Sequence, residues 1–153
     1  RRIAGLPHDS VKMSVFVQQS INADLSGVLV TINPYDTTQK NSAYIAAKRG
    51  LGIRVVEGKR VAEQVVYNRR NDSVQRLSSS NETTALQLDK NGGVREVPVT
   101  SGNVMNQEQI RRLDQTGQQI KQLFANGEQD IEWAFDNGKL VILQARPYLN
   151  GSR

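Results

Sequence analysis

Four polar side chains near the C-terminal end of the sequence have the types and spacing needed to hold a metal–phosphate group. Asp130 and Glu132 alternate with apolar residues in one segment, and Gln144 and Arg146 do so in a second segment that follows an Asn-Gly pair. Mg²⁺ prefers oxygen ligands, usually a few carboxylates completed by substrate phosphates and water. An arginine fork suits phosphate oxygens. These residue types therefore offer chemistry for a metal–nucleotide complex.

The two segments predict a β-hairpin, because side chains alternate across a strand with a period of two. The simplest pairing places the apolar residues of both strands against one core, and paired residue numbers then sum to an even value. The residues expected on that core are Ile131, Trp133, Phe135, Val141, Leu143 and Ala145. The other face would carry the four polar side chains, Asp136, Ala134, and the aliphatic residues Leu140 and Ile142.

The exact register decides how the polar residues meet. A sum of 276 places Glu132 opposite Gln144 and Asp130 opposite Arg146, whereas a sum of 274 makes them diagonal neighbours that are still within reach. In either case Ile142 is expected beside them, where it could lie under a flat base. The alternative interpretation is an exposed hairpin face with a surface Asp–Arg pair, worth only about 0–1 kcal/mol.

The rest of the chain predicts further strands and one helix. Strand-like runs occupy residues 13–21, 27–33, 42–47, 53–56 and 63–67, and residues 86–99 form another hairpin around the turn DKNGG. Residues 68–81 are polar and are expected to be irregular. The fold class expected is α+β, a mostly antiparallel sheet with one long amphipathic helix.

The helix is indicated by a start signal, an apolar stripe and a stop signal. Asn106 and Gln109 have the spacing of a capping box, and the helix should end near Asn126 and Gly127, a left-handed pair. The stripe comprises Ile110, Leu113, Gly117, Ile120, Leu123 and Phe124.

Bulk composition narrows the class of protein. The 153 residues suit a single domain, 1–153. The mean hydropathy of −0.52 is that of a soluble chain, and no apolar run approaches the roughly 18 residues of a membrane span. The sequence begins without the apolar core of a signal peptide and contains no cysteine, which excludes disulfides and thiolate metal sites. A cytoplasmic protein without membrane contact is therefore expected.

The net charge of +5 leaves a nucleic-acid-binding domain as one hypothesis. The basic residues are spread over doublets rather than one block, and no aromatic-rich stacking strand accompanies them. We therefore prefer a solvated surface, or one that faces an anionic ligand, and expect no nucleic-acid partner.

The segment DIEWAFDNGKLVILQARP resembles the end of the ATP-grasp nucleotide-binding domain of the phosphoenolpyruvate synthase and pyruvate phosphate dikinase family, which closes on D-I-E-W/F and then Q-A/S/T-R-P. VFVQQSINADLSGVLVTINP is similar to the family's V-x-V-Q-x-M-V-x-x-x-x-S-G-V-x-F-T-x-x-P, and IAAKRGLGIRVVEGKRVAEQVVYNR to its A-x-x-G-L-G-E-x-V-V-x-G-x-V-x-P-D-x-Y-x-V. Since three separated motifs occur in order, the resemblance covers nearly the whole chain.

The resemblance implies ATP and Mg²⁺ as cofactors and assigns roles to individual residues. Glu132 and Gln144 match the Mg²⁺–nucleotide ligands, Asp130 matches the neighbouring acidic residue, and Arg146 matches a phosphate-contacting arginine to which we assign a catalytic role. The remaining expected cofactor-binding residues are Gln18 and Gln19 before the adenine-binding hinge, Gly50 and Gly52 in the G-L-G turn, and Ile142. The chain departs from the motifs at Ser20, at Ile53 and at Val61-Ala62-Glu63-Gln64.

The resemblance further implies a dikinase that transfers a phosphoryl group from ATP to a histidine located elsewhere and then to pyruvate or a related acceptor. His8, the only histidine, lies in a loop-like LPHDS. The chain is therefore expected to be the C-terminal portion of an ATP-grasp domain, inactive alone. Its expected partners are an N-terminal ATP-grasp lobe, a phosphohistidine domain and a pyruvate-binding barrel. The alternatives are a non-catalytic binding or assembly module, and a rifampicin-phosphotransferase-like or starch-dikinase-like relative.

Overall fold

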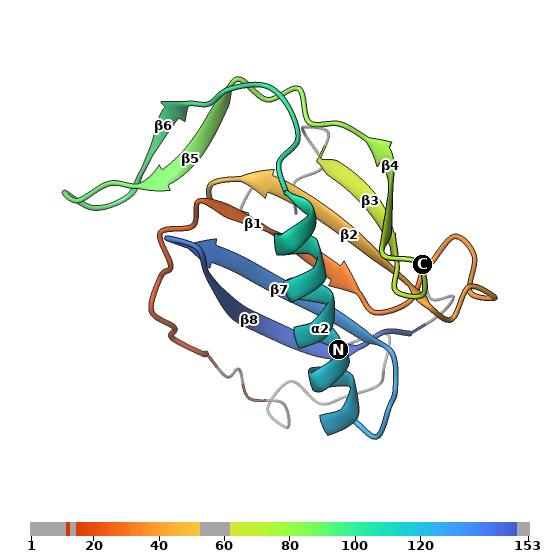
Figure 1. Cartoon of the computed structure of the whole chain (residues 1–153). Helices are drawn as coiled ribbons and strands as arrows, with labels where there is room; N and C mark the ends of the chain where they lie inside the picture. The colour runs from red at the N-terminus through yellow and green to blue at the C-terminus, as the bar shows by residue number, and fades with distance from the viewer. Residues whose placement is uncertain (1–11, 13–14, 53–61, 150–153) are drawn as a thin grey trace, which may run out of the picture.

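The computed structural model describes residues 12, 15–52 and 62–149. Within them, a six-stranded antiparallel sheet of order β4-β3-β2-β1-β7-β8 is crossed on one face by the helix α2, and a separate hairpin, β5–β6, stands apart from both (Figure 1). No helix in this part of the chain is long and apolar enough to cross a membrane. The bounds are β1 Leu25–Val30, β2 Ser42–Arg49, β3 Glu63–Asn68, β4 Ser73–Ser78, β5 Thr84–Leu88, β6 Val94–Pro98, α2 Gln107–Leu123, β7 Gln129–Asp136 and β8 Lys139–Pro147.

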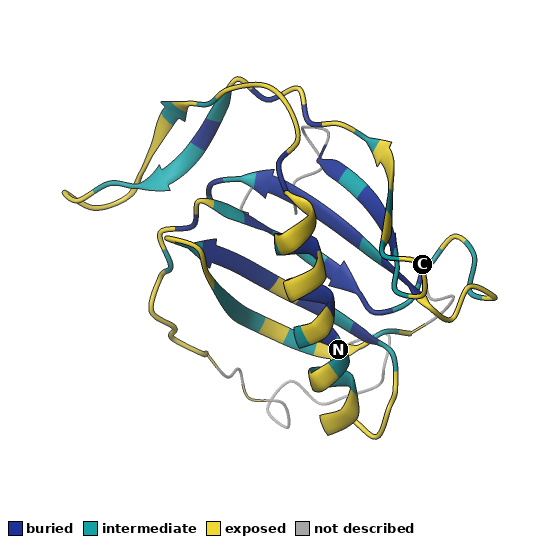
Figure 2. Cartoon of the chain, viewed as in Figure 1, coloured by how far each residue is buried: buried dark blue, intermediate teal, exposed yellow. Residues whose placement is uncertain are grey.

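The predicted α+β class, mostly antiparallel with a single helix among the described residues, agrees with this architecture. One core fills the space between the sheet and α2, and Figure 2 shows the central strands as the most buried elements. Period-two alternation places odd-numbered residues of β1, β2, β3 and β7 on that side. The buried cluster comprises Leu29, Ala43, Ile45, Ala47, Val65, Tyr67, Val104, Met105, Ile110, Leu113, Ile131, Trp133 and Phe135.

The helix starts as predicted. The Asn106 side chain accepts from the backbone N–H of Gln109, and the Gln109 side chain accepts from the backbone N–H of Asn106, which completes the capping box. At the other end the left-handed residues are Ala125 and Asn126, rather than Asn126 and Gly127. Gly117 brings the helix close to β1, because a Cβ there would lie 2.5 Å from Cδ2 of Leu29.

The β7–β8 hairpin contains two registers. Asn137 and Gly138 have positive φ angles of 49° and 75°, as in a type I′ turn, and this two-residue turn pairs Asp136 with Lys139. A β-bulge after Glu132 then shifts the register, so that residue 143 has no partner in the ladder. Beyond the bulge the paired numbers sum to 276, which is one of the two registers expected.

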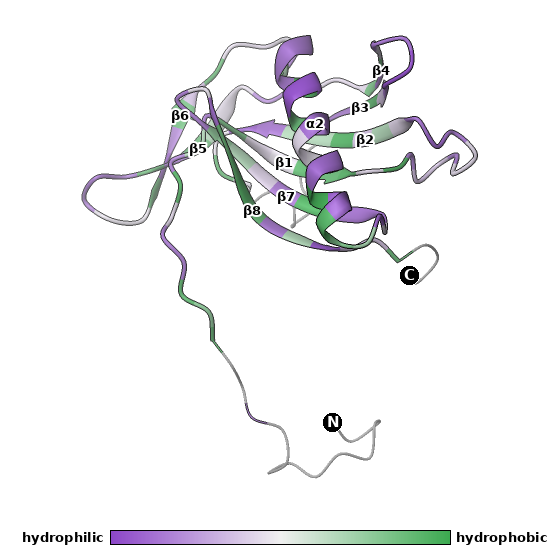
Figure 3. Ribbon diagram, turned by 60° about the horizontal axis from the view of Figure 1, so that its bottom comes forward, coloured by the Kyte–Doolittle hydropathy of each residue, from purple (hydrophilic) through white to green (hydrophobic). Residues whose placement is uncertain are grey.

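Three sequence expectations have different outcomes. The described residues of 13–21 form no strand, and Val15, Phe16 and Val17 are almost fully exposed; in Figure 3 this segment runs away from the sheet. The prediction failed because an apolar alternation makes a strand only where a neighbouring strand satisfies its backbone. Residues 68–81 are not irregular throughout, since they contain β4, which pairs with β3. The expected strand at 53–56 lies outside the described residues.

Candidate functional site

The face of the sheet opposite α2, here called the open face, carries the four polar residues of the terminal hairpin. Glu132 of β7 lies directly opposite Gln144 of β8, and Asp130 lies directly opposite Arg146. Directly paired residues share a face, so all four side chains project from the same side of two neighbouring strands. Glu132, Gln144 and Arg146 are exposed, and Asp130 is half-buried.

The oxygen atoms of Glu132 and Gln144 are free to bind a ligand. Within the described residues, neither side chain makes a hydrogen bond or an ion pair with the protein. A carboxylate beside a carboxamide oxygen is a donor set that suits Mg²⁺. Among the residues that the structure describes, no three or more His, Cys, Asp or Glu side chains lie close enough together to hold a metal ion by themselves. A magnesium ion on this pair would thus need phosphate oxygens and water as further ligands.

Asp130 orients the guanidinium of Arg146. Nε and Nη2 of Arg146 donate to Oδ2 of Asp130 at 3.0 and 2.7 Å. These contacts, with a smaller contribution from the charge of Glu132, raise the pKa of Arg146 above its usual value. The arginine therefore keeps its positive charge on the open face, beside the carboxylate–amide pair.

A pocket of about 690 Å³ adjoins Glu132 on the open face. Gln18, Gln19, Gly52 and Glu132, four of the residues predicted for the site, line it, whereas Gly50, Asp130, Gln144 and Arg146 lie outside its lining. The other lining residues are Ser20, Ile21, Ala23, Ser26, Gly27, Val28, Leu51, Leu88, Gly93, Val94, Trp133, Ala134 and Leu143. A concave, mainly apolar site with a few polar groups is typical of small-ligand pockets.

The two glycines of the G-L-G turn have different surroundings. Gly50 has a φ of +73°, and a Cβ there would lie 2.2 Å from the carbonyl oxygen of Leu86, so this position permits no side chain. Its own carbonyl accepts a hydrogen bond from Oγ of Ser26 at 2.6 Å. Gly52 borders the pocket, where a Cβ would lie 3.3 Å from that same Oγ. Gly50 thus shapes the turn, and Gly52 lines the pocket.

The expectation that Leu140 and Ile142 share the face of Glu132 is wrong. The bulge opposes Ile142 to Trp133 and Leu140 to Phe135, so both aliphatic residues pack against the core cluster. The bulged residue, Leu143, lines the pocket in place of Ile142. The assumption of a single even register missed this exchange. The Asn-Gly turn was the signal that could have revealed it, because a two-residue turn requires an odd sum near the hairpin end.

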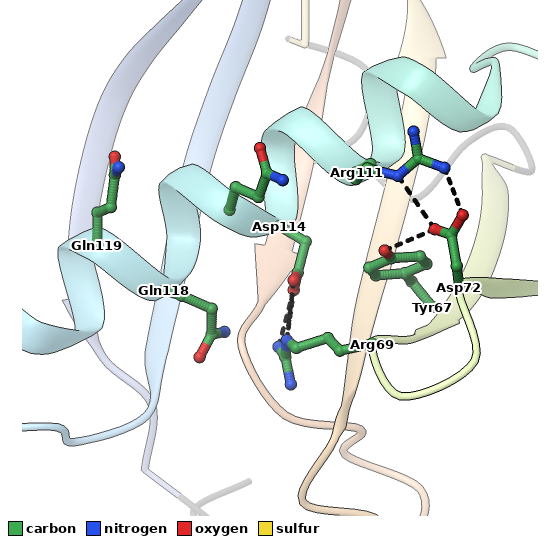
Figure 4. A pocket seen from close by; sticks show the side chains of 8 residues that line it. Tyr67, Arg69, Asp72, Arg111, Asp114, Gln118 and Gln119 are labelled. Carbon is green, nitrogen blue, oxygen red and sulfur yellow. Dashed lines mark hydrogen bonds and ion pairs between the residues drawn. The ribbon is translucent and has the colours of Figure 1, made fainter.

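A second pocket, of about 590 Å³, lies on the helix-covered side between α2 and the end of β3. Figure 4 shows its charged groups paired with one another: Arg69 with Asp114, and Arg111 with Asp72, which also accepts from the Tyr67 hydroxyl at 2.8 Å. Burial raises the pKa of Asp114, an effect that Arg69 opposes. Since its cations already have carboxylate partners, this pocket offers little to an anionic ligand and serves to attach the helix to the sheet.

Comparison with known proteins identifies the family of this chain and several relatives. All of residues 1–153 match the family described as "Pyruvate phosphate dikinase, AMP/ATP-binding domain". Probable phosphoenolpyruvate synthases of Archaeoglobus fulgidus and Pyrococcus horikoshii are 31% and 32% identical over 94% of the chain, and a rifampicin phosphotransferase of a Streptomyces species is 31% identical over 94%. The chain spans only 19%, 19% and 16% of the length of these three relatives.

The family match covers the pocket, the G-L-G turn and the terminal hairpin alike, and one of these relatives is a phosphotransferase by name. The chain therefore belongs to the pyruvate phosphate dikinase AMP/ATP-binding domain family.

Proposed function

We propose that this chain is the Mg²⁺–ATP-binding part of a phosphoenolpyruvate synthase-like dikinase, with an ATP-grasp-like arrangement. The observation that carries the proposal is the direct pairing of Glu132 with Gln144, whose oxygen atoms are free, where Glu132 meets the pocket. The base of the nucleotide would occupy the pocket, and its phosphates would extend along the open face towards Arg146.

Each residue of the pair would contribute oxygen ligands that fix the position of the phosphates. When bound, Mg²⁺ would supply charge neutralisation on the phosphate oxygens. Arg146, held by Asp130, would present its guanidinium to the transferring phosphoryl group, where electrostatic stabilisation and positioning provide most of the catalysis. Gln18 and Gln19 would contact the base from the side of the pocket formed by the segment before β1.

The phosphoryl group would pass to a histidine in another part of a longer protein and from there to pyruvate. The small share of each relative that the chain spans is consistent with such further parts. A second acceptor is favoured by a specific observation, since a rifampicin phosphotransferase is as similar to this chain as the phosphoenolpyruvate synthases are. The proposal therefore includes a related acceptor such as rifampicin as the alternative to pyruvate.

The metal–nucleotide assignment is tested by calorimetric titration with Mg²⁺ and a non-hydrolysable ATP analogue. Glu132→Ala and Gln144→Ala should each weaken binding about 100-fold, because each removes a ligand from the phosphate end. The matched controls are Glu108→Ala and Gln119→Ala, exposed residues of α2. Unchanged affinity in both open-face variants would contradict the assignment.

The acceptor is tested in the protein as its gene encodes it. Incubation with ATP labelled on its phosphates should produce a protein-bound phosphohistidine, which Glu132→Ala should prevent. Transfer of the label to pyruvate would support the first reaction, and transfer to rifampicin the second. Retention of tight nucleotide binding without any phosphohistidine would instead indicate a non-catalytic binding module.

A further inference from the structure

The β5–β6 hairpin stands apart from the main sheet, yet one end of it reaches the pocket of the open face. Leu88, at the end of β5, and Gly93 and Val94, at the start of β6, all line that pocket. Figure 1 shows that the hairpin lies away from α2, so it takes no part in the core that the helix covers. Its position beside the pocket therefore needs a separate explanation.

At its turn end, the hairpin presents an apolar pair to the pocket and a polar pair to the other side. Leu88 lies directly opposite Val94, so their side chains share one face. The next pair, Gln87 and Arg95, lies on the opposite face. Val94 is 48% exposed although it is β-branched and hydrophobic. An aliphatic pair that borders a cavity and is partly exposed is well suited to contact a flat apolar ligand surface.

Hydrogen bonds attach the β5–β6 hairpin to the same segments that form the rest of the pocket. The backbone N–H of Leu51, in the G-L-G turn, donates to the carbonyl of Leu86 at 2.8 Å. The backbone N–H of Leu88 donates to Oδ1 of Asn22 at 3.1 Å, which joins the hairpin to the segment that carries Gln18 and Gln19. The hairpin is therefore connected to two other sides of the pocket.

A buried ion pair fixes the chain that leads into β5. Nζ of Lys48 lies 3.4 Å from Oε1 of Glu82, and both side chains are almost completely buried. Lys48 belongs to β2 and Glu82 precedes the hairpin, so the pair attaches the hairpin to the main sheet. Breaking a buried pair is strongly unfavourable. The hairpin thus has a defined position beside the pocket, which a contact with a ligand would require.

We propose that Leu88 and Val94 form the wall against which the nucleobase packs, and that this hairpin helps the pocket to favour a nucleotide over a base-free polyphosphate. This inference rests on the proposed function. The base is assigned to the hairpin end because the residues that line it are apolar. The oxygen and guanidinium groups suited to phosphates lie at the other end, on β7 and β8.

The test uses Leu88→Ser and Val94→Ser in the protein as its gene encodes it, with Val97→Ser as the matched control on the other hairpin face. Two probes are titrated with Mg²⁺: a non-hydrolysable ATP analogue and inorganic tripolyphosphate. Each wall variant should weaken binding of the nucleotide roughly 5- to 20-fold and leave binding of tripolyphosphate unchanged. Val97→Ser should alter neither.

Several results would overturn the inference. If the wild-type protein and both wall variants bind the nucleotide equally well, Leu88 and Val94 do not contact the base. The inference then fails while the proposed function stands. Equal weakening of both probes would mean a general structural effect and would also overturn it. Val94→Thr keeps the side-chain shape and so guards against misfolding, and it should also weaken binding of the nucleotide. Folding of each variant is monitored by the fluorescence of Trp133, the single tryptophan. Absence of nucleotide binding by the wild type would overturn the proposed function as well.

Discussion

The two faces of the sheet each carry an arginine–aspartate pair, and the two pairs differ in burial. On the helix-covered face, Nε of Arg69 donates to both carboxylate oxygens of Asp114 at 2.9 and 2.8 Å, and the side chains are 19% and 5% exposed. On the open face, Arg146 contacts Asp130 with the side chains 62% and 19% exposed. The same two residue types thus occur in a mainly buried and a mainly solvated setting.

The difference in exposure predicts that the two contacts contribute unequally to stability. Asp114 lies on α2 and Arg69 follows β3, so their pair joins the helix to the sheet, and Nη2 of Arg69 also donates to the carbonyl of Thr31 at 2.8 Å. A solvated pair contributes little to stability. Loss of the Arg146–Asp130 contact should therefore leave the fold intact, as the proposed phosphate-binding role requires. The following changes separate that role from the structural role of Arg69 and Asp114.

The largest effect is expected for Arg69→Ala, which leaves the buried carboxylate of Asp114 without its partner. The free energy of unfolding should fall by about 3 kcal/mol, since removal of one member of a buried pair exposes the full desolvation cost of the other. Chemical denaturation followed by Trp133 fluorescence measures the change. Arg70→Ala, the exposed neighbour, is the control and should change stability by less than about 0.5 kcal/mol. A similar small loss in both variants would contradict a structural role for the Arg69–Asp114 pair.

A smaller effect of a different kind is expected for Arg146→Ala. Affinity for the Mg²⁺–ATP analogue should fall about tenfold through the loss of a charged contact to phosphate, while the free energy of unfolding changes by about 0–1 kcal/mol. Arg146→Lys should recover only part of the affinity, because an ammonium lacks the planar fork. Calorimetric titration and denaturation of the same samples test both statements. If Arg146→Ala lowered the free energy of unfolding as much as Arg69→Ala does, the claim that the solvated pair contributes little to stability would be contradicted.

Deletion of Leu143 sharpens the comparison within the terminal hairpin. Removal of the unpaired residue lets the register set by the two-residue turn continue, and Glu132 still faces Gln144 and Asp130 still faces Arg146. The deletion should therefore keep tripolyphosphate binding and weaken nucleotide binding about fivefold, since one apolar side chain leaves the pocket. Leu143→Ala is the control that keeps the bulge and should weaken the nucleotide similarly. Loss of both ligands would show that the bulge itself is required at the phosphate end.

The smallest effect expected is a difference in pH dependence between two aspartates on the helix-covered side. Burial raises the pKa of Asp114 in the folded protein above its ordinary value of 3.8. As the pH falls, the folded state therefore takes up this proton before the unfolded state does, and the contribution of Asp114 to stability increases. Hydrogen bonds from Arg111 and Tyr67 lower the pKa of Asp72, so its contribution, present above 3.8, is lost as the pH falls.

Denaturation curves at several pH values between about 3 and 7 should therefore show opposite trends. Relative to Asp114→Asn, the wild-type protein should gain stability as the pH falls. Relative to Asp72→Asn, the wild-type protein should lose stability as the pH falls. Parallel trends for the two variants would mean that the burial of Asp114 does not control its protonation.

Alternation and capping rules predicted much of this architecture. The capping box of Asn106 and Gln109, the hairpin around DKNGG and the shared face of Glu132 and Gln144 all depend on local spacing, which sequence displays directly. The exchange of Ile142 for Leu143 was not predicted, because a bulge reconciles a turn-determined register with the burial of Trp133. Neither requirement alone reveals it.

Long-range packing accounts for the remaining differences. The segment with Val15, Phe16 and Val17 has a strand-like pattern but no pairing partner among the described residues, whereas the polar β4 forms a strand because β3 supplies one. The hairpin residues Leu88 and Val94 gave no signal as pocket residues. Their place depends on contacts with Leu51 and Asn22, which are distant in sequence.

The most direct test of the central claim is a crystal structure of the protein with Mn²⁺ in place of Mg²⁺ and a non-hydrolysable ATP analogue, with the metal located by its anomalous scattering. The proposed site predicts a manganese peak about 2.1 Å from oxygen atoms of both Glu132 and Gln144 and of the nucleotide phosphates, with the base against the pocket wall. A metal–nucleotide complex bound elsewhere, with Glu132 and Gln144 facing solvent, would contradict the account.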